Sequence, residues 1–398
     1  MEQGDIRIER LSQRGEGIAG DVRVPFALPG ERWRTDPLTL LKPAPERVEA
    51  VCPVFGTCGG CAVQHANDSF VARWKEGQIQ SALAAHGLSA PMRACATSPP
   101  ATRRRASLHV RRTRKTVEIG FLQRASHVLV PLTGCPVLCP AIATRLEDLA
   151  QLGGFGASRQ GLARLDVTAT DAGLDVVLVP AKPLSPKALD DTLALARTLD
   201  LARLSLGEEV VFLSRPPVLR FDGIDVVPPP GAFLQATPQG EAALRADVAQ
   251  IVGDATRVVD LFAGCGTFAL PLARGAEVLA VEGAQDLLDA LDRAWRGAHG
   301  LRRVVSLRRD LFRRPLLAAE LKGVEVVVID PPRAGGEAQM RELAASGVSR
   351  VASVSCNPVT FARDAKLLVE AGFSLDWVRM VDQFRWSPHV ELTASFTR

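Results

Sequence analysis

The last third of the chain alternates strand-like and helix-like segments, and this alternation constrains the fold more than any other feature. Each of the apolar runs RVVDLF, AEVLAVE, VEVVVID and RVASVS is followed by a turn or loop. Strands that alternate with helices form parallel, doubly wound sheets. We therefore expect a Rossmann-like α/β domain over residues 231–398, with a final antiparallel hairpin at the sheet edge.

The rest of the chain predicts two further parts. Residues 1–48 contain short alternating segments with Gly and Pro turns, which are typical of a small β-barrel or half-barrel. Residues 49–230 mix predicted helices, over 68–86 and 185–198, with predicted strands. No run of about eighteen apolar residues occurs, and the start lacks the features of a secretion signal. We expect a soluble, cytoplasmic protein that does not associate with membranes.

Basic residues gather in one short stretch of the central region. The net charge is only +4, from 48 basic and 44 acidic residues, so the mean charge excludes little. The segment from Arg103 to Lys115, however, contains seven Arg and Lys residues and no acid. A local cluster of this kind suits the phosphate backbone of a nucleic acid. The alternative is a strand face that is simply solvated.

A glycine-containing turn predicts a nucleoside cofactor. The segment Asp260-Leu-Phe-Ala-Gly264-Cys-Gly266-Thr267 lies between a strand and a helix, and Glu282 ends the next strand. Glycines let the backbone approach a ligand closely, and an acid at that strand end can bind ribose hydroxyls. The pattern lacks the third glycine of a pyrophosphate site. Asp310 follows a later strand and is a candidate for the adenine region, or else a helix N-cap.

Two later strand ends carry the candidate reacting groups. Asp330-Pro-Pro-Arg333 follows one buried-type strand, and Cys356 follows another. Ligands of such folds bind beyond the carboxyl ends of the strands, so both segments should line the active site. The arginine after the two prolines, where many amino-group methyltransferases have an aromatic residue, argues against an exocyclic amine as acceptor. A cysteine in this position is well placed as a nucleophile, although a lone thiol is more often structural.

Four of the eight cysteines suggest a metal site in the central part. Cys52, Cys58 and Cys61 are closely spaced and flanked by glycines, and Cys135 follows later in the same part. Disulfides are not the default in an intracellular chain, and four thiolates can hold zinc or an iron–sulfur cluster. The chemistry alone does not choose between the two metals. Cys139 is an alternative fourth ligand.

These motifs resemble the RNA 5-methyluridine methyltransferases, a class I S-adenosylmethionine-dependent family. The resemblance is carried by Ser355-Cys356-Asn357-Pro358, by Asp330-Pro-Pro-Arg-Ala-Gly335 and by the segment from Asp382 to Glu391, which ends in His-Val-Glu. It is dense over residues 235–391 and looser elsewhere. The family usually has other residues at Arg385 and Ser387.

The resemblance assigns roles to individual residues. It implies that Cys356 is the nucleophile, that Glu391 is the general base and that His389 accompanies it. It implies a [4Fe–4S] cluster on Cys52, Cys58, Cys61 and Cys135, and a reduced TRAM-like domain over residues 1–48. The residues that it places around S-adenosylmethionine are Gln235, Phe262, Gly264, Thr267, Glu282, Asp310 and Asp330.

The expected activity is methyl transfer to carbon 5 of a uridine in RNA. The thiol cluster favours 23S ribosomal RNA, because the transfer-RNA branch of the family usually lacks it. The target base must leave any stack to reach Cys356, so we expect a single-stranded loop as substrate. Separately, we expect the enzyme to be a monomer. The alternatives are a transfer-RNA uridine methyltransferase and a non-catalytic iron–sulfur RNA-binding protein.

Overall fold

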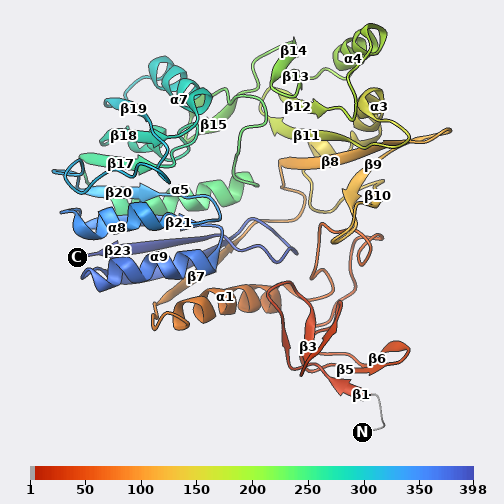
Figure 1. Ribbon diagram of the computed structural model, residues 1–398, viewed down its shortest axis with the longest axis horizontal. Helices are drawn as coiled ribbons and strands as arrows, with labels where there is room; N and C mark the ends of the chain where they lie inside the picture. The colour runs from red at the N-terminus through yellow and green to blue at the C-terminus, as the bar shows by residue number, and fades with distance from the viewer. Residues whose placement is uncertain (1–4) are drawn as a thin grey trace.

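The computed structural model describes residues 5–398, so the first four residues of the expected 1–48 domain lie outside the described part. The described chain forms a small N-terminal β-domain, a central α/β part and a large sheet domain (Figure 1). The helices of residues 5–398 are all too short or too polar to cross a membrane.

The N-terminal part consists of two small antiparallel sheets, in agreement with the short strands expected there. Its core contains Ile8, Val24 and Ala27. The strands of the first sheet, in spatial order, are β1 (Asp5–Arg7), β5 (Arg32–Thr35) and β6 (Leu38–Lys42), and those of the second are β2 (Arg10–Leu11), β3 (Gly17–Ala19) and β4 (Val22–Val24).

The central part contains a seven-stranded sheet with helices packed on it. Leu108 and Val110 are buried at alternate positions of their strand, as expected for a strand with one face on the core. A Cβ at Gly153 would lie 2.5 Å from Cγ2 of Val110, so the helix approaches the sheet closely only because this position is glycine. In spatial order the strands are β10 (Leu129–Pro131), β9 (Val117–Leu122), β8 (Arg105–Arg112), β11 (Ala163–Thr170), β12 (Gly173–Val179), β13 (Arg203–Leu206) and β14 (Glu209–Leu213). The helices are α2 (Pro140–Ala143), α3 (Leu146–Gly156) and α4 (Pro186–Thr198).

The large domain is an eight-stranded sheet with a core on each face. Five strands are parallel, as the alternating pattern predicted. In spatial order the strands are β19 (Val304–Arg308), β18 (Glu277–Glu282), β17 (Arg257–Leu261), β20 (Val326–Ile329), β21 (Arg350–Ser355), β23 (Leu392–Thr397), β22 (Ser374–Asp382) and β7 (Met92–Thr97). The helices are α1 (Asp68–Ala84), α5 (Pro238–Val252), α6 (Ala269–Leu272), α7 (Gln285–Gly297), α8 (Glu337–Ala345) and α9 (Pro358–Glu370). A hairpin of β15 (Leu219–Phe221) and β16 (Ile224–Val226) joins this domain to the central part.

The position of the final hairpin corrects one expectation. β22 and β23 are antiparallel, as predicted, but they do not form the sheet edge. β23 lies between β21 and β22, and β7 pairs in parallel with the outer side of β22. β7 comes from the segment that the sequence pattern placed in the central part, and α1 packs its Ile79 and Leu83 into the same core. The prediction failed because strand periodicity gives no information on which distant strand is the neighbour.

The sheet order defines the crevice in which a ligand should bind. β17 pairs with β18 on one side and with β20 on the other, so the order of connections reverses at β17. Ligands of doubly wound sheets bind at such a switch point, beyond the carboxyl ends of the strands. The segments singled out in the sequence follow β17, β18, β20 and β21 directly.

Candidate active site and cofactor site

The turn after β17 leaves its backbone accessible at one glycine. Gly264 and Gly266 have φ angles of 55° and 95°, in the left-handed region. A Cβ at Gly266 would lie 2.8 Å from Cγ of Leu270, whereas a Cβ at Gly264 would meet nothing within 4 Å. Gly266 is therefore required for packing, while Gly264 borders open space that a ligand can occupy. Thr267 lies half-buried in the same turn.

Glu282 joins the ends of two neighbouring strands. Its Oε2 accepts a hydrogen bond of 3.1 Å from the amide of Gly264, and its Oε1 accepts from Gly283 at 2.6 Å. The half-buried carboxylate is thus held beside the glycine turn, where the sequence analysis placed it. A fixed carboxylate at this strand end can accept hydrogen bonds from ribose hydroxyls.

Asp310 is exposed and caps a turn. Its Oδ1 accepts from the amide of Phe312 at 3.0 Å, so the capping alternative holds, although for a turn and not for a helix. The half-exposed ring of Phe312 packs against Phe262 with centroids 5.4 Å apart. This pair gives an apolar surface beside Asp310 that a flat base could cover. Phe312 was missed in the sequence, although a large aromatic residue two positions after a strand-end acid was a usable signal.

Three carboxyl groups lie close together at the crevice. Asp260 is fully buried, and its pKa is raised well above the usual value by burial and then by the charges of Asp330 and Glu282. Burial also raises the pKa of Asp330 to about 7. Acids that raise one another's pKa favour a cation among them. The crevice therefore suits a positively charged ligand.

Cys356 directly follows β21, next to two acids. Burial, followed by the charges of Glu391 and Asp330, raises the pKa of the half-buried Cys356 thiol to about 11, and Arg333 opposes the shift. Asn357 caps α9 through Val359, and its Nδ2 donates to the carbonyl of Arg333 at 2.9 Å. The structure thus brings the two predicted reacting segments together.

Glu391 is buried directly before β23. Burial, followed by the charge of Asp330, raises its pKa well above the usual value. Gln383 donates from Nε2 to Glu391 Oε2 at 3.0 Å and to Gln235 Oε1 at 2.5 Å. Gln235 in turn donates from Nε2 to Asp330 Oδ2 at 3.3 Å. Two amides therefore connect the two acids, and Gln383 was missed in the sequence.

The segment that precedes Glu391 is held by the N-terminal half of the chain. Lys75 of α1 is completely buried, and its Nζ donates to Asp382 Oδ1 at 2.7 Å and to the carbonyl of Phe384 at 3.0 Å. The amides of Ala62 and Val63, next to Cys61, donate to the carbonyl of Trp386 at 2.8 and 3.1 Å. The loop beside the acids is therefore bonded directly to the cysteine-bearing loop.

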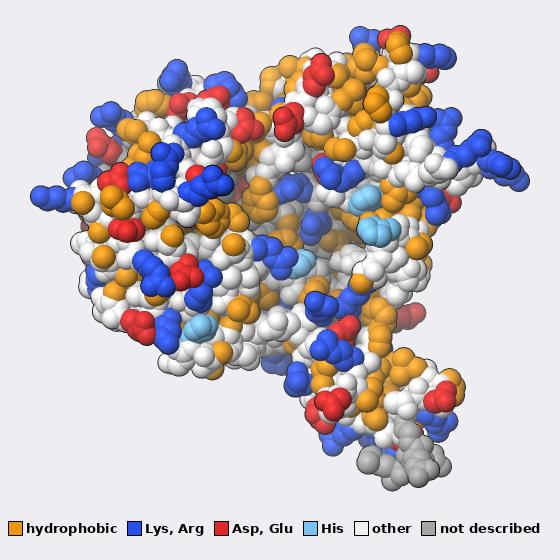
Figure 2. Space-filling model, viewed as in Figure 1, with side chains coloured by type: hydrophobic (Ala, Val, Ile, Leu, Met, Phe, Trp, Pro, Cys, Tyr) orange, Lys and Arg blue, Asp and Glu red, His pale blue; other side chains and the backbone are white. Residues whose placement is uncertain are grey.

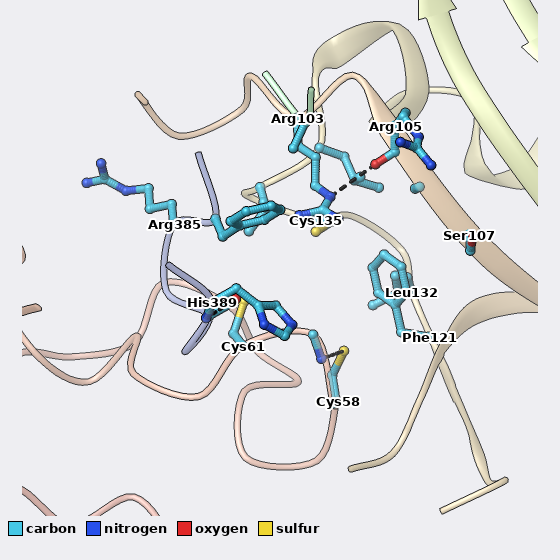
Figure 3. A pocket seen from close by; sticks show the side chains of 18 of the residues that line it. Cys58, Cys61, Arg103, Arg105, Ser107, Phe121, Leu132, Cys135, Arg385 and His389 are labelled. Carbon is cyan, nitrogen blue, oxygen red and sulfur yellow. Dashed lines mark hydrogen bonds between the residues drawn. The ribbon is translucent and has the colours of Figure 1, made fainter. Parts of the chain in front are cut away.

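Four cysteines line one cavity of about 890 Å³ between the central part and this loop. Cys58, Cys61 and Cys135 surround it together with His389 (Figure 3). Burial, together with the charges of the other thiols, raises the pKa of Cys61 to about 12, although a hydrogen bond with Gln64 opposes the shift. Cys139 caps α2 and is not among the residues that line the cavity. The thiol cluster is the set Cys52, Cys58, Cys61 and Cys135.

The thiols of the cluster lie close enough together that the charges of the others raise the pKa of Cys58, Cys61 and Cys135. Within residues 5–398, no three Cys, His, Asp or Glu side chains are arranged to hold a single metal ion. The amide of Gly60 donates to the sulfur of Cys58 at 3.5 Å, which is the kind of contact that stabilises a thiolate. His389 lies beside Cys61 in the same cavity (Figure 3), and burial, followed by the charge of Arg333, lowers its pKa.

The arginines of the basic stretch fall into two groups that make different contacts. Arg104 and Arg111 form ion pairs with Glu241 and Glu118, so these two arginines are structural, contrary to a phosphate-binding role for the whole stretch. Arg103 and Arg105 instead line the cavity. Their guanidinium groups lie 5.7 and 5.1 Å from the ring centroids of Phe384 and Phe233.

The cavity opens into a hollow between the two larger parts of the molecule. Figure 2 shows this hollow with Lys and Arg side chains along it. Burial lowers the pKa of both Arg103 and Arg105, which indicates that their charge is only partly solvated. Guanidinium groups beside aromatic rings can bind phosphates and unstacked bases.

Known RNA methyltransferases resemble this chain. Residues 232–398 match the family described as tRNA (Uracil-5-)-methyltransferase. An RNA methyltransferase of Rhizobium meliloti is 43% identical over 415 residues, with 100% of both chains covered. The 23S rRNA (uracil(1939)-C(5))-methyltransferase RlmD of Edwardsiella ictaluri is 34% identical, over 90% of this chain and 83% of that protein.

A solved structure shows the same fold over the whole chain. The tRNA (uracil-54, C5)-methyltransferase of Pyrococcus abyssi, in complex with S-adenosyl-L-homocysteine, superimposes with a TM-score of 0.80 at 20% identity, and all of both chains is covered. At this identity the likeness concerns the fold, which includes the small N-terminal sheets as well as the large α/β domain.

Proposed function

This chain belongs to the family of RNA uracil-5 methyltransferases, and we propose that it methylates carbon 5 of a uridine in 23S ribosomal RNA through a covalent bond to Cys356. The observation that carries the proposal is the position of Cys356 at a strand end, beside Glu391 and Asp330. The choice of ribosomal RNA goes beyond the family assignment. A uridine in transfer RNA is the competing substrate, which the experiments below distinguish.

The proposed cofactor is S-adenosylmethionine, which supplies an electrophilic methyl group on a sulfonium cation. The acidic surroundings of Asp260, Asp330 and Glu282 fit a cation. Gly264 borders open space beside the carboxylate of Glu282, which fits a ribose. Phe262, Thr267, Asp310 and Gln235 complete the proposed contacts.

The residue types fit the chemistry of uracil. Carbon 5 is too weak a nucleophile to accept a methyl group unaided. Addition of the Cys356 thiolate to carbon 6 forms a C–S bond and moves electron density to carbon 5, which then forms the bond to the methyl group. Glu391 afterwards takes the proton from carbon 5, the C5–C6 double bond returns and the C–S bond breaks, releasing the thiolate.

Ribosomal RNA is favoured by the thiol cluster, which the resemblance associates with a [4Fe–4S] cluster. A single zinc ion needs four ligands at about 2.0–2.3 Å, which implies a compact group. Four thiols that line one cavity can hold either metal, and the resemblance is what favours the iron cluster. Methyl transfer involves no oxidation or reduction. We therefore assign the iron–sulfur cluster a structural role, next to the loop that holds Trp386.

The RNA would enter through the basic hollow. Arg103 and Arg105 provide positive charge beside Phe384 and Phe233 at the rim of the active site. A uridine must leave its stack to reach Cys356, which costs a few kcal/mol and least in a loop. We propose a single-stranded loop as substrate, a TRAM-like RNA-binding role for the N-terminal sheets and a cytoplasmic enzyme.

The decisive experiment uses RNA in which the target uridine is replaced by 5-fluorouridine. Fluorine cannot be removed by a base, so the covalent adduct should persist and its peptide should contain Cys356. A Cys95→Ala variant, which changes a thiol of β7 outside the site, should form the same adduct. Methylation of normal RNA without any adduct would overturn the mechanism.

The target is tested separately by mapping 5-methyluridine in cells with and without the gene. Loss of the modification from ribosomal RNA supports the proposal. Loss only from transfer RNA would assign the competing substrate, and no loss in either RNA would favour a non-catalytic role.

A further inference from the structure

Gln383 occupies a central place in the active site without being one of its reacting groups. It is buried, with 2% of its surface exposed, directly after β22. Its side chain makes three hydrogen bonds, to Gln235, to Glu391 and to the amide of Ala236. A glutamine amide has two donor hydrogens and one acceptor oxygen, so these contacts use its donors fully.

The orientation of this amide is set by the backbone. The amide N–H of Ala236 donates to Oε1 of Gln383 at 2.7 Å, which forces the Nε2 group of Gln383 toward Glu391. The second hydrogen of that Nε2 donates to Oε1 of Gln235, so the Nε2 of Gln235 must face Asp330. One backbone N–H therefore orients both amides, and each acid receives one N–H donor.

The two acids at the ends of this chain of hydrogen bonds interact. Burial and the charge of Asp330 raise the pKa of Glu391, whereas the hydrogen bond from Gln383 lowers it. Glu391 can accept a proton only in its ionised form. A donor that favours the ionised form of a buried carboxylate thus acts against both burial and the neighbouring acid.

We propose that Gln383 is a positioning residue for proton removal, which holds Glu391 in an ionised and correctly oriented state. The inference rests on the proposed function, because it concerns the step in which the C5–H bond breaks, Glu391 takes the proton and the C6–S bond to Cys356 breaks. Gln383 itself exchanges no proton. Its removal should slow release of the methylated adduct and leave its formation nearly unchanged.

The test measures both steps in single-turnover reactions over a range of pH. Gln383→Met removes the donors at similar size. We expect adduct release about 10- to 100-fold slower near neutral pH, in line with loss of a hydrogen bond to a charged group. Since the lost bond lowered the pKa of Glu391, release should also need a higher pH, with its midpoint about one unit above that of the unaltered enzyme. Methyl transfer into the adduct should change less than about threefold.

Gln339→Met is the matched control. Gln339 is another buried glutamine, with 1% exposed surface, and it bonds to the amide and the carbonyl of Leu316, away from the acids. Its loss can lower the melting temperature but should leave the pH midpoint of release unchanged. If Gln383→Met does not fold, Gln383→Asn keeps an amide that is one methylene shorter and should shift the midpoint in the same direction, by less.

The outcomes are distinguishable. The inference is overturned if Gln383→Met releases the adduct at the rate and pH midpoint of the unaltered enzyme. It is also overturned if release is slower but the pH midpoint does not move, because a loss of packing alone would then explain the slower rate. If the unaltered enzyme methylates RNA without any adduct, the proposed function itself fails.

Discussion

Cys356 and the thiol cluster place the same functional group in two different surroundings. Burial raises the pKa of the thiol in both, to about 11 at Cys356 and to about 12 at Cys61. The second cause differs. At Cys356 it is the carboxylates of Glu391 and Asp330, whereas at Cys61 it is the other thiols of the cluster.

This difference shows how the neighbours determine what a thiol can do. A thiol beside a base and at a strand end is placed to form and break a bond with a substrate. Several thiols that oppose one another's ionisation can all ionise only around a cation, so they are placed to hold a metal. The two regions should therefore respond differently to the same kinds of change.

The largest effect should come from loss of the nucleophile. Cys356→Ala should lower methyl transfer by at least about 10⁴-fold, because the C–S bond can no longer form. Its melting temperature and metal content should stay unchanged. Transfer of a labelled methyl group to RNA measures this, with Cys95→Ala as control. Activity within tenfold of the unaltered enzyme would remove Cys356 from the comparison.

Loss of the base should be nearly as large but should affect a different step. Glu391→Gln should reduce turnover by roughly 10²- to 10⁴-fold, the usual contribution of general base catalysis. The methylated adduct should accumulate, because nothing removes the carbon 5 proton. Denaturing electrophoresis of protein with labelled RNA detects the adduct. Reduced turnover without accumulation would assign Glu391 to an earlier step.

The stability of the loop between the two regions should depend on Lys75. Lys75→Met leaves the buried carboxylate of Asp382 without its partner, which should lower the free energy of unfolding by about 3–5 kcal/mol. Lys187→Met removes an exposed pair with Asp191 and should change it by only about 0–1 kcal/mol. Denaturant unfolding of both variants measures the difference. Equal effects would show that burial of Lys75 has no energetic consequence.

Metal removal should affect the cluster region more than Cys356. Cys61→Ser, or chelation, should abolish binding of the proposed iron cluster and lower the free energy of unfolding by about 3 kcal/mol, as for loss of a ligand at a hundred times its Kd. Cys139→Ser should keep the metal, since Cys139 does not line the cavity. Metal analysis and thermal melting test this. Zinc alone in the purified protein would overturn the iron assignment.

The smallest effect is a shift in thiol reactivity. Only the thiolate reacts with iodoacetamide, so alkylation of Cys356 in the free protein should rise with pH toward a midpoint of about 11. Glu391→Gln removes a negative charge and should lower this midpoint by about one unit. Mass spectrometry of the Cys356 peptide follows the reaction. Cys61 should not respond, because its pKa is raised by burial and by other thiols and not by Glu391.

The sequence predicted the regular elements well, because their signals are local. The helices α1 and α4 lie within a few residues of the predicted ranges 68–86 and 185–198. The turn glycines and the strand-end residues Glu282, Asp330 and Cys356 could be located for the same reason, since the carboxyl ends of parallel strands meet at one edge.

What could not be predicted depends on contacts between distant segments. Lys75 bonds to Asp382, 307 positions away, and nothing in the neighbourhood of either residue indicates the other. The place of β7 beside β22 has the same origin. Gln383 was missed because its importance lies in an amide orientation set by Ala236, and orientation leaves no mark in a sequence.

The partnership of β7 with β22 also orders events during synthesis of the chain. At about 5–20 residues per second, the roughly 280 residues between Thr97 and Ser374 take on the order of 15–60 s to be made. Throughout that time β7 has no sheet to join, and an unpaired strand edge invites wrong pairing. On the ribosome, the catalytic sheet is therefore completed late, and a nascent chain interrupted before β22 leaves β7 available to bind a chaperone or another strand.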